Sequence, residues 1–184
     1  MKKTFNVLFI SMLLALVACG PNQEQKALKA SQDFKTFLPT FLEAAKAVKN
    51  QEVYLHKDLG VYVYTNPGTV CVATKNNKVA NMDGMNEIPA TNIFDRKPKG
   101  TYCEGYPGEK DGFYFVETTK DDLPSYFDVE GQTGKKVVLP KNLDYKKFIK
   151  VTVIKGESFY VELYFTFLDS TWYLIGQNFC DCSA

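Results

Sequence analysis

The sequence predicts an α+β fold in which N-terminal helices pack on a curved, mostly antiparallel sheet. The first observation is a helical periodicity of apolar residues over 27–48, early in the chain. The second is a series of β-branched and aromatic segments that starts near residue 59 and ends in three successive strand patterns over 148–178. Helical signals followed by a run of strand signals are typical of the α+β class, because alternating βαβ units would place helices between the strands.

A leader precedes the predicted domain. Lys2 and Lys3 are followed by a mainly apolar run over 5–17. This run is too short to span a bilayer as a helix, and its basic flank is that of a signal peptide. The run ends in Leu16-Val17-Ala18-Cys19, which resembles the lipobox of bacterial lipoproteins.

The lipobox resemblance implies a lipid anchor. The signal peptidase would remove residues 1–18, and Cys19 would carry the acyl chains that hold the protein on a lipid bilayer. Residues 19–25 would then be the acylated cysteine and a short tether. By the same resemblance, Gly20 in the second mature position implies delivery to the outer membrane of a Gram-negative bacterium. The alternative is an ordinary secretion signal whose cysteine joins a disulfide.

Residues 26–184 have a length that suits a single α+β domain. The mature chain of 166 residues has 20 basic and 21 acidic side chains, because the leader contains two of the 22 basic residues. This nearly neutral charge implies no nucleic-acid partner. The 11 tyrosines and 14 phenylalanines indicate a packed globular domain rather than a disordered stalk.

The helical segment carries an apolar stripe with lysines on its opposite side. Pro39 lies inside the pattern and removes a backbone donor, so the sequence predicts either one kinked helix or two short ones. The stripe follows helical spacing and consists of Phe34, Phe37, Leu38, Phe41, Leu42, Ala45 and Val48.

Strand signals follow the helix. Residues 59–65 and 69–74 flank Asn66-Pro67-Gly68 and predict a hairpin. Residues 75–111 predict mostly surface loop with short elements, because they are rich in Asn, Gly, Lys and Pro. Residues 112–118 predict a further strand, and residues 121–127 a helical turn.

Three strands in succession are predicted over 148–154, 158–168 and 172–178. On the middle strand, one face is expected to be core and the other amphipathic, since alternate side chains point to opposite sides of a sheet. The core face would consist of Phe159, Val161, Leu163, Phe165 and Phe167. The amphipathic face would consist of Tyr160, Glu162, Tyr164 and Thr166.

The aromatic helix over 34–48 and the closing strands over 159–167 and 171–176 resemble the cystatin-like cone fold of nuclear transport factor two, SnoaL-type proteins and ketosteroid isomerase. The stretch over 60–68 also resembles a recurring element of uncharacterised bacterial lipoproteins. The resemblance implies helices laid across a curved sheet. A different α+β arrangement and a lipocalin-like barrel are the alternatives.

Four cysteines besides Cys19 are disulfide candidates: Cys71, Cys103, Cys180 and Cys182. An exported compartment is oxidising, so two bridges with three connectivities are open. Cys180 and Cys182 are too close in sequence for an unstrained mutual bond, which favours each of them pairing with Cys71 or Cys103. A Cys-x-Cys metal or redox site is the competing interpretation, but the chain has one histidine and no further ligand pattern.

No catalytic, metal-binding or cofactor-binding constellation is predicted. His56 lacks a positioned partner for acid or base chemistry, and Glu162 is interpreted as a solvated sheet residue. Tyrosines offer an apolar body with a polar tip, so they could form a binding surface or simple cross-strand packing. The binding candidates are Tyr62, Tyr64, Tyr160, Glu162, Tyr164 and Tyr173.

These observations favour a membrane-anchored envelope lipoprotein with a non-catalytic role, binding a small molecule, a peptide or another envelope protein. A homodimer through the tyrosine face is a further expectation. One alternative is an isomerase or dehydratase of the cone fold, which would use a buried carboxylate and a tyrosine. The other is a structural spacer without a ligand.

Overall fold

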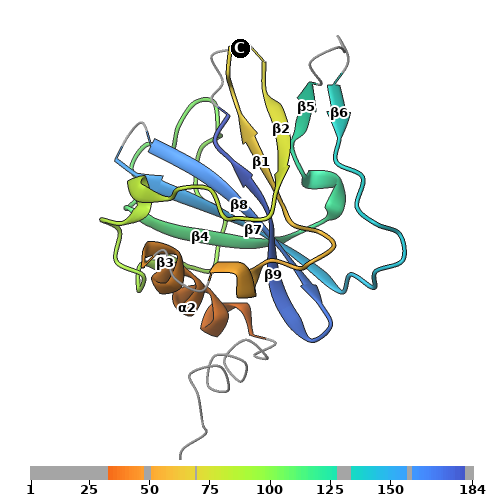
Figure 1. The fold of residues 1–184 in the computed structure, drawn as a ribbon. Coiled ribbons are helices and arrows are strands. Elements are labelled where there is room, and N and C mark those ends of the chain that lie inside the picture. The colour runs from red at the N-terminus through yellow and green to blue at the C-terminus, as the bar shows by residue number, and fades with distance from the viewer. Residues whose placement is uncertain (1–32, 48–50, 69, 128–133, 157–158, 181–184) are drawn as a thin grey trace, which may run out of the picture.

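The computed structural model describes residues 33–47, 51–68, 70–127, 134–156 and 159–180 (Figure 1). It is an α+β structure, as predicted, with one α-helix, three short 3-10 helices and nine strands among these residues. Residues 1–32, which include the predicted leader over 1–18 and Cys19, lie outside the described residues.

The helix α2 spans Phe34–Lys46 and continues through Pro39 as a single element. It begins at Asp33, whose side chain accepts hydrogen bonds from the Lys35 backbone N–H at 3.0 Å and from the Thr36 hydroxyl at 3.0 Å. This cap satisfies a backbone donor that has no partner in the first turn. Of the two alternatives that Pro39 left open, the structure therefore shows one helix.

Seven strands form a mixed, mostly antiparallel sheet in the order β2-β1-β9-β8-β7-β4-β3. In the described residues this series ends at β2 and β3 and does not close, so the lipocalin-like alternative is wrong. The strands are β1 (Val61–Thr65), β2 (Val72–Asn76), β3 (Ile93–Phe94), β4 (Gly112–Thr118), β7 (Lys147–Lys155), β8 (Phe159–Leu168) and β9 (Thr171–Asn178).

The predicted hairpin and the three closing strands are confirmed. β1 pairs with β2, and β7, β8 and β9 pair in succession, all antiparallel. The parallel pairs β1–β9 and β3–β4 were not predicted from the sequence. Beyond the end of β2 at Asn76, residues 77–111 contain only the 3-10 helix η2 (Asp83–Met85) and the short β3, which agrees with the loop predicted over 75–111.

The helical turn predicted over 121–127 is only partly correct. The 3-10 helix η3 spans Lys120–Asp122 and is capped by Thr119, but Ser125–Phe127 is the strand β5. β5 pairs with β6 (Gly134–Lys136) in a separate two-stranded ribbon. The Asp122 side chain reaches back to the Thr119 backbone N–H at 2.9 Å in a capping box that starts the helix. Leu123 precedes a proline and has an extended ψ of 140°, which ends the helical conformation early.

The sheet has two covered faces, which we name the helix face and the loop face. α2 packs on the helix face, where the Phe41 and Phe165 rings lie 5.0 Å apart and the Phe34 and Trp172 rings 4.9 Å apart. The β8 residues on this face are Val161, Leu163, Phe165 and Phe167, all buried as predicted. The Phe159 side chain is not among those described.

A β-bulge in β9 changes the alternation of side chains between the faces. Tyr164 pairs with Gly176 and Phe165 with Leu174, so Ile175 is the extra residue. Beyond the bulge, Gln177 lies on the helix face and Asn178 on the loop face. If the same sequence formed a regular strand without the bulge, these two side chains would exchange faces.

Candidate functional site

Four of the six predicted binding residues lie in two neighbouring rows on the loop face, each running across four strands. The backbone register defines both rows. The first row contains Lys150, Tyr164, Gly176 and Tyr62, and the second contains Thr152, Glu162, Asn178 and Tyr64.

Glu162 is the centre of this arrangement. Its side chain is 8% exposed, and its carboxylate accepts three hydrogen bonds. Lys150 Nζ donates to Oε1 at 3.0 Å, whereas the Tyr164 hydroxyl and Asn178 Nδ2 donate to Oε2 at 2.6 Å and 3.3 Å. A buried carboxylate needs such a set of donors, because the loss of its hydration costs several kcal/mol. We name these four residues the Glu162 cluster.

The interpretation of Glu162 as a solvated residue is wrong. The loop face is not open, because side chains from the segment before β7 pack against it. Leu139, Leu143 and Tyr145 contact a buried group on this face that includes Tyr164. Local alternation in β8 cannot indicate which distant segment will cover a face.

Burial changes the acidity of both buried tyrosines on this face. The pKa of Tyr164 is raised well above its ordinary value by burial, and further by the charge and hydrogen bond of Glu162. The pKa of Tyr64 is also raised by burial, with smaller effects of Tyr62 and Tyr126. Both phenols therefore stay protonated at neutral pH, and the Tyr164 hydroxyl acts as a donor. The Tyr64 hydroxyl is buried and has no hydrogen-bond partner among the described residues.

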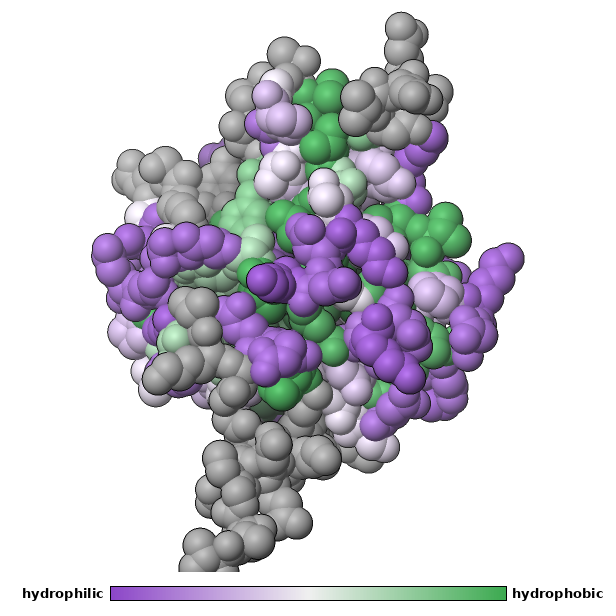
Figure 2. Space-filling view, viewed as in Figure 1, coloured by the Kyte–Doolittle hydropathy of each residue, from purple (hydrophilic) through white to green (hydrophobic). Residues whose placement is uncertain are grey.

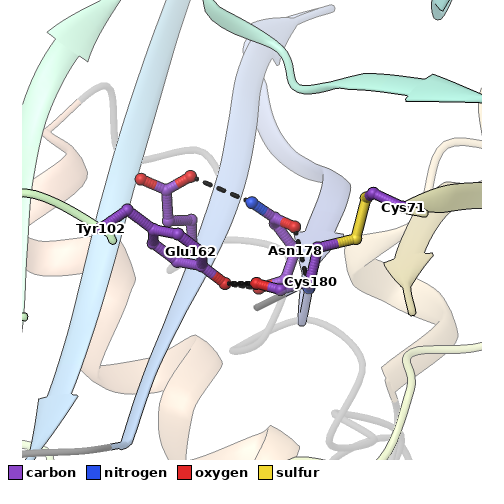
Figure 3. The surroundings of a disulfide bond; sticks show 5 residues. All are labelled: Cys71, Tyr102, Glu162, Asn178 and Cys180. Carbon is purple, nitrogen blue, oxygen red and sulfur yellow. Dashed lines mark hydrogen bonds between the residues drawn. A yellow bond between two sulfur atoms is a disulfide. The ribbon is translucent and has the colours of Figure 1, made fainter. Parts of the chain in front are cut away.

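A disulfide bond between Cys71 and Cys180 lies next to the Glu162 cluster (Figure 3). It joins the residue before β2 to the segment after β9, with Cα atoms 5.7 Å apart. Asn178 Oδ1 accepts a hydrogen bond from the Cys180 backbone N–H at 3.1 Å, and the Tyr102 hydroxyl donates to the Cys180 carbonyl. The expected pairing of Cys180 with Cys71 or Cys103 is thus confirmed as Cys71–Cys180.

The remaining cysteines divide between described and undescribed parts of the chain. Cys103 is also disulfide-bonded. Cys182, like Cys19, lies outside the described residues. The Cys71–Cys180 bond contradicts a metal or redox role for a free Cys-x-Cys pair, because one of its two thiols is already in a disulfide.

Tyr173 does not join the Glu162 cluster. It is half-buried towards the other end of β9, where its ring meets the His56 ring edge-on at 5.1 Å. His56 is itself buried, accepts from the Asp58 backbone N–H at 3.2 Å and lies 3.8 Å from Asp169. These contacts match the structural role expected for the histidine. The Tyr160 side chain is not among those the structure describes.

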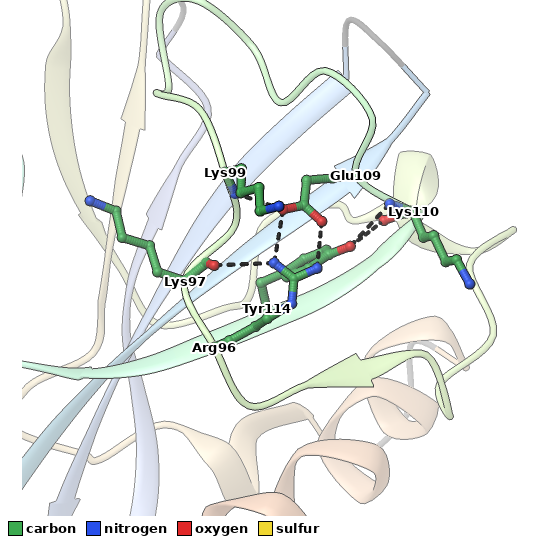
Figure 4. A network of polar contacts seen from close by, with 6 residues as sticks. All are labelled: Arg96, Lys97, Lys99, Glu109, Lys110 and Tyr114. Atoms are coloured by element: carbon green, nitrogen blue, oxygen red, sulfur yellow. Dashed lines mark hydrogen bonds and ion pairs between the residues drawn. The ribbon is translucent and has the colours of Figure 1, made fainter.

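A second polar network fastens the long loop before β4 (Figure 4). Arg96 forms two hydrogen bonds with the Glu109 carboxylate, at 2.8 and 2.5 Å, and its guanidinium lies 4.8 Å from the centroid of the Tyr114 ring. The hydrogen bond from Arg96 is the largest cause that lowers the pKa of Glu109, from 4.5 to about 2. Tyr114 donates to the Lys110 carbonyl at 2.8 Å. All these groups are satisfied by the chain itself, so the network closes the loop rather than offering a site.

A pocket of about 400 Å³ lies on the other side of the sheet, at the end of α2. It is partly open to solvent and has the size of small-molecule sites. We name it the α2-end pocket. Its lining residues come from α2, from the 3-10 helix η1 (Gln51–Tyr54) and from the segment around η2. They are Ala45, Lys46, Gln51, Val79, Ala80, Asn81, Met82, Asp83 and Asn86.

The floor of the α2-end pocket is fixed to the sheet by a buried amide. Gln177 is fully buried, accepts from the Ala80 backbone N–H at 2.7 Å and donates to the Ala80 carbonyl at 3.4 Å. This paired contact holds residues 79–82 against β9. The β9 bulge makes it available, because it turns Gln177 to the helix face.

The sequence did not predict the α2-end pocket. Its polar residues lie in a segment that composition marks as surface loop, and the cluster of Asn and Asp over 81–86 signals a turn rather than a cavity. Lys46 and Gln51 belong to α2 and η1, and only the tertiary fold brings them next to residues 79–86. The pocket could be found from the structure alone.

The outer surface offers little apolar area for docking. In the view of Figure 2, hydrophilic residues cover most of the visible face, and hydrophobic residues appear between them. Among the described residues, Val70 and Val138 are the exposed large hydrophobic side chains, at 40% and 79%. No helix within the described ranges has the length and hydropathy needed to span a membrane. Within the same ranges, no group of three or more potential metal ligands is found.

Comparisons of the chain with protein-family models, with curated proteins and with solved structures found no match.

Proposed function

We propose that the protein is a lipid-anchored envelope lipoprotein of the outer membrane of a Gram-negative bacterium, and that its domain has a non-catalytic role in binding a small ligand. The observation that carries the binding role is the α2-end pocket, whose lining combines polar and charged side chains with apolar ones. We also propose that the α+β fold is a cone of the cystatin-like type, since a single amphipathic helix lies across the sheet. A protein that served only as a spacer would have no use for a pocket with a fixed floor.

The lipobox over 16–19 supports the anchor. Cys19→Ala should abolish incorporation of labelled palmitate and release the protein from membranes when it is expressed in a Gram-negative host. Cys182→Ala is the matched control, because it removes a cysteine outside the lipobox and should retain both properties. Palmitate labelling of the Cys19→Ala variant would contradict the anchor.

The Glu162 cluster favours structural stabilisation over catalysis. Both carboxylate oxygens already accept hydrogen bonds from the chain, so a substrate would have to displace an internal donor to reach them. The pocket, in contrast, contains the exposed Asp83 and no tyrosine. A cone-fold enzyme would need its acid and its tyrosine in one cavity.

The enzyme alternative has one observation in its favour, the 2.6 Å hydrogen bond between Tyr164 and the buried Glu162. Carbodiimide coupling of an amine to accessible carboxylates, read by peptide mass spectrometry, tests it. We expect Glu162 to stay unlabelled in the folded protein, while Glu117, whose side chain is 78% exposed, becomes labelled. Labelling of Glu162 at a rate near that of Glu117 would favour the enzyme.

Two methionines provide a test of binding at the pocket. Met82 lines the pocket, whereas Met85 is buried but is not part of the lining. A fragment library screened with ¹³C-methyl methionine should give compounds that shift the Met82 signal and leave Met85 unchanged. If no fragment shifts Met82, the α2-end pocket is not a binding site.

The homodimer is a further proposal, but the tyrosine face contributes less to it than expected. Tyr64 and Tyr164 are buried within the chain, so only the half-buried Tyr62 of the two rows has phenol surface to offer. Gel filtration of the full chain in detergent, with static light scattering, measures the oligomeric state. Tyr62→Ala should leave a dimer intact if the interface lies elsewhere.

A further inference from the structure

We propose that the α2-end pocket selects a small aliphatic zwitterion, a molecule with one carboxylate, one ammonium group and a short apolar side chain. This inference rests on the proposed binding function and assigns it a ligand class. It depends on the pairing of one cationic and one anionic side chain in the lining, Lys46 and Asp83, above an apolar floor.

Lys46 supplies the group for a ligand carboxylate. Its Nζ donates to the Ile88 carbonyl at 2.5 Å, which holds the ammonium in place and uses one of its three donors. Two donors remain for a ligand. The positive charge also offsets the partial negative charge of the free carbonyls at the end of α2, which would otherwise repel an anion.

Asp83 supplies the group for a ligand ammonium. Asn81 Nδ2 donates to Oδ2 at 2.5 Å, and Asn86 Nδ2 donates to Oδ1 at 3.3 Å. These two amides orient the carboxylate and leave a lone pair on each oxygen. Among the described residues, Asp83 has no cationic partner, so its charge is not neutralised by them.

The apolar lining residues determine which uncharged group the ligand can have. Val79, Ala80 and Met82 line the floor, and no aromatic ring is among the lining residues. A sugar ring or a nucleobase would lack the stacking surface that such ligands use. A short aliphatic chain fits the floor, and methionine adapts readily to its shape. Because Gln177 holds Ala80 in place, little ordering is needed on binding.

Calorimetry and methionine-methyl NMR on the full chain in detergent test the ligand class with L-leucine as the probe. Two analogues each lack one charge: 4-methylpentanoate has no ammonium, and 3-methylbutylamine has no carboxylate. We expect leucine to shift Met82 but not Met85, and each analogue to bind about tenfold more weakly, the loss that one charge-assisted hydrogen bond explains. Binding of L-alanyl-L-leucine would then distinguish a peptide source from a free amino acid.

Matched variants test whether the charges of Lys46 and Asp83 contribute to binding. Lys46→Met and Asp83→Asn should each weaken leucine binding about tenfold. Lys35→Met, on the exposed side of α2, and Asp95→Asn, in an exposed loop, should leave it unchanged. Asp83→Asn keeps the size of an exposed side chain, so it tests the charge even if Lys46→Met lowers stability.

The outcomes separate this inference from the proposed function. Equal binding of leucine and both analogues at Met82, or unchanged leucine binding in both Lys46→Met and Asp83→Asn, would overturn the zwitterion and leave a binding pocket. The same conclusion follows if library fragments shift Met82 and leucine does not. If neither leucine nor any fragment shifts Met82, both proposals are wrong.

Discussion

Replacing Glu162 with glutamine tests whether the Glu162 cluster holds the sheet together. The change removes the negative charge from a side chain that is 8% exposed and leaves the Lys150 ammonium without its partner at 3.0 Å. It also turns one acceptor into a donor, which must then face Lys150 or the donors of Tyr164 and Asn178. Breaking a buried ion pair from one side costs about 3–5 kcal/mol.

The expected cost lies at or below the lower limit of that range. The Lys150 side chain keeps 27% of its surface exposed, so water can hydrate part of the orphaned charge. We therefore expect Glu162→Gln to lower the free energy of unfolding by about 2–3 kcal/mol. Urea unfolding of the oxidised protein at neutral pH measures this value, provided that the m-value is unchanged.

An exposed pair on the same sheet provides the control. Glu117 and Lys147 lie 3.8 Å apart with side chains 78% and 56% exposed, and Glu117→Gln should cost less than about 1 kcal/mol. The double variant Glu162→Gln with Lys150→Met should recover part of the loss, because it leaves no orphaned charge. If Glu162→Gln costs no more than Glu117→Gln, the cluster does not stabilise the fold and the structural interpretation of Glu162 is wrong.

Three further substitutions have defined outcomes. Glu109→Gln should destabilise the protein at pH 7. The difference in stability from the wild type should be complete above about pH 4.5 and shrink as the pH falls towards 2, because the pKa of Glu109 is lowered from 4.5 to about 2 in the folded state. A difference that stays constant in acid unfolding curves would contradict this. Ser170→Gly should raise the free energy of unfolding by about 0.5–1 kcal/mol, since Asp169 and Ser170 have positive φ angles of 50° and 59° in the two-residue turn between β8 and β9; unchanged thermal stability would argue against strain there. Gly176→Ala should cost about 1–3 kcal/mol, because its Cβ would lie 3.3 Å from the Tyr164 side chain; a neutral result in urea would show that the ring can move aside.

The elements that could be predicted from sequence are those with a local signal. The apolar stripe from Phe34 to Ala45 specifies which side of α2 is buried, and all of its described members are buried. Alternation along β8 specifies the helix face in the same way. The Asn66-Pro67-Gly68 segment marks the β1–β2 hairpin, because its residues favour turn conformations.

The features that could not be predicted depend on contacts between distant segments. Tyr62 pairs with Gly176 in the parallel β1–β9 ladder, across more than a hundred residues, and nothing in either strand specifies the other. The neighbouring Tyr164 belongs to a buried group on the loop face against which Leu139, Leu143 and Tyr145 pack. For the candidate site, the sequence identified Glu162 and Tyr164 but not Lys150 or Asn178, which complete the hydrogen bonding of the Glu162 carboxylate.

The β9 bulge connects the two polar regions of the molecule. Ile175 is the inserted residue. Because the strand accommodates it as a bulge, Gln177 faces the α2-end pocket and Asn178 faces the Glu162 cluster. In a regular strand, the two side chains would exchange faces, so the Ala80 backbone would lose its amide partner and Glu162 would lose one donor. An alanine inserted between Gly176 and Gln177 should therefore weaken both regions together, since a one-residue shift moves every following side chain to the opposite face. Gln177→Leu should shift the Met82 methyl signal and leave the Glu162 cluster intact. Asn178→Leu should lower the free energy of unfolding and leave the Met82 methyl signal unchanged. If either single variant reproduced the effects of both, the two regions would be coupled by something other than the bulge.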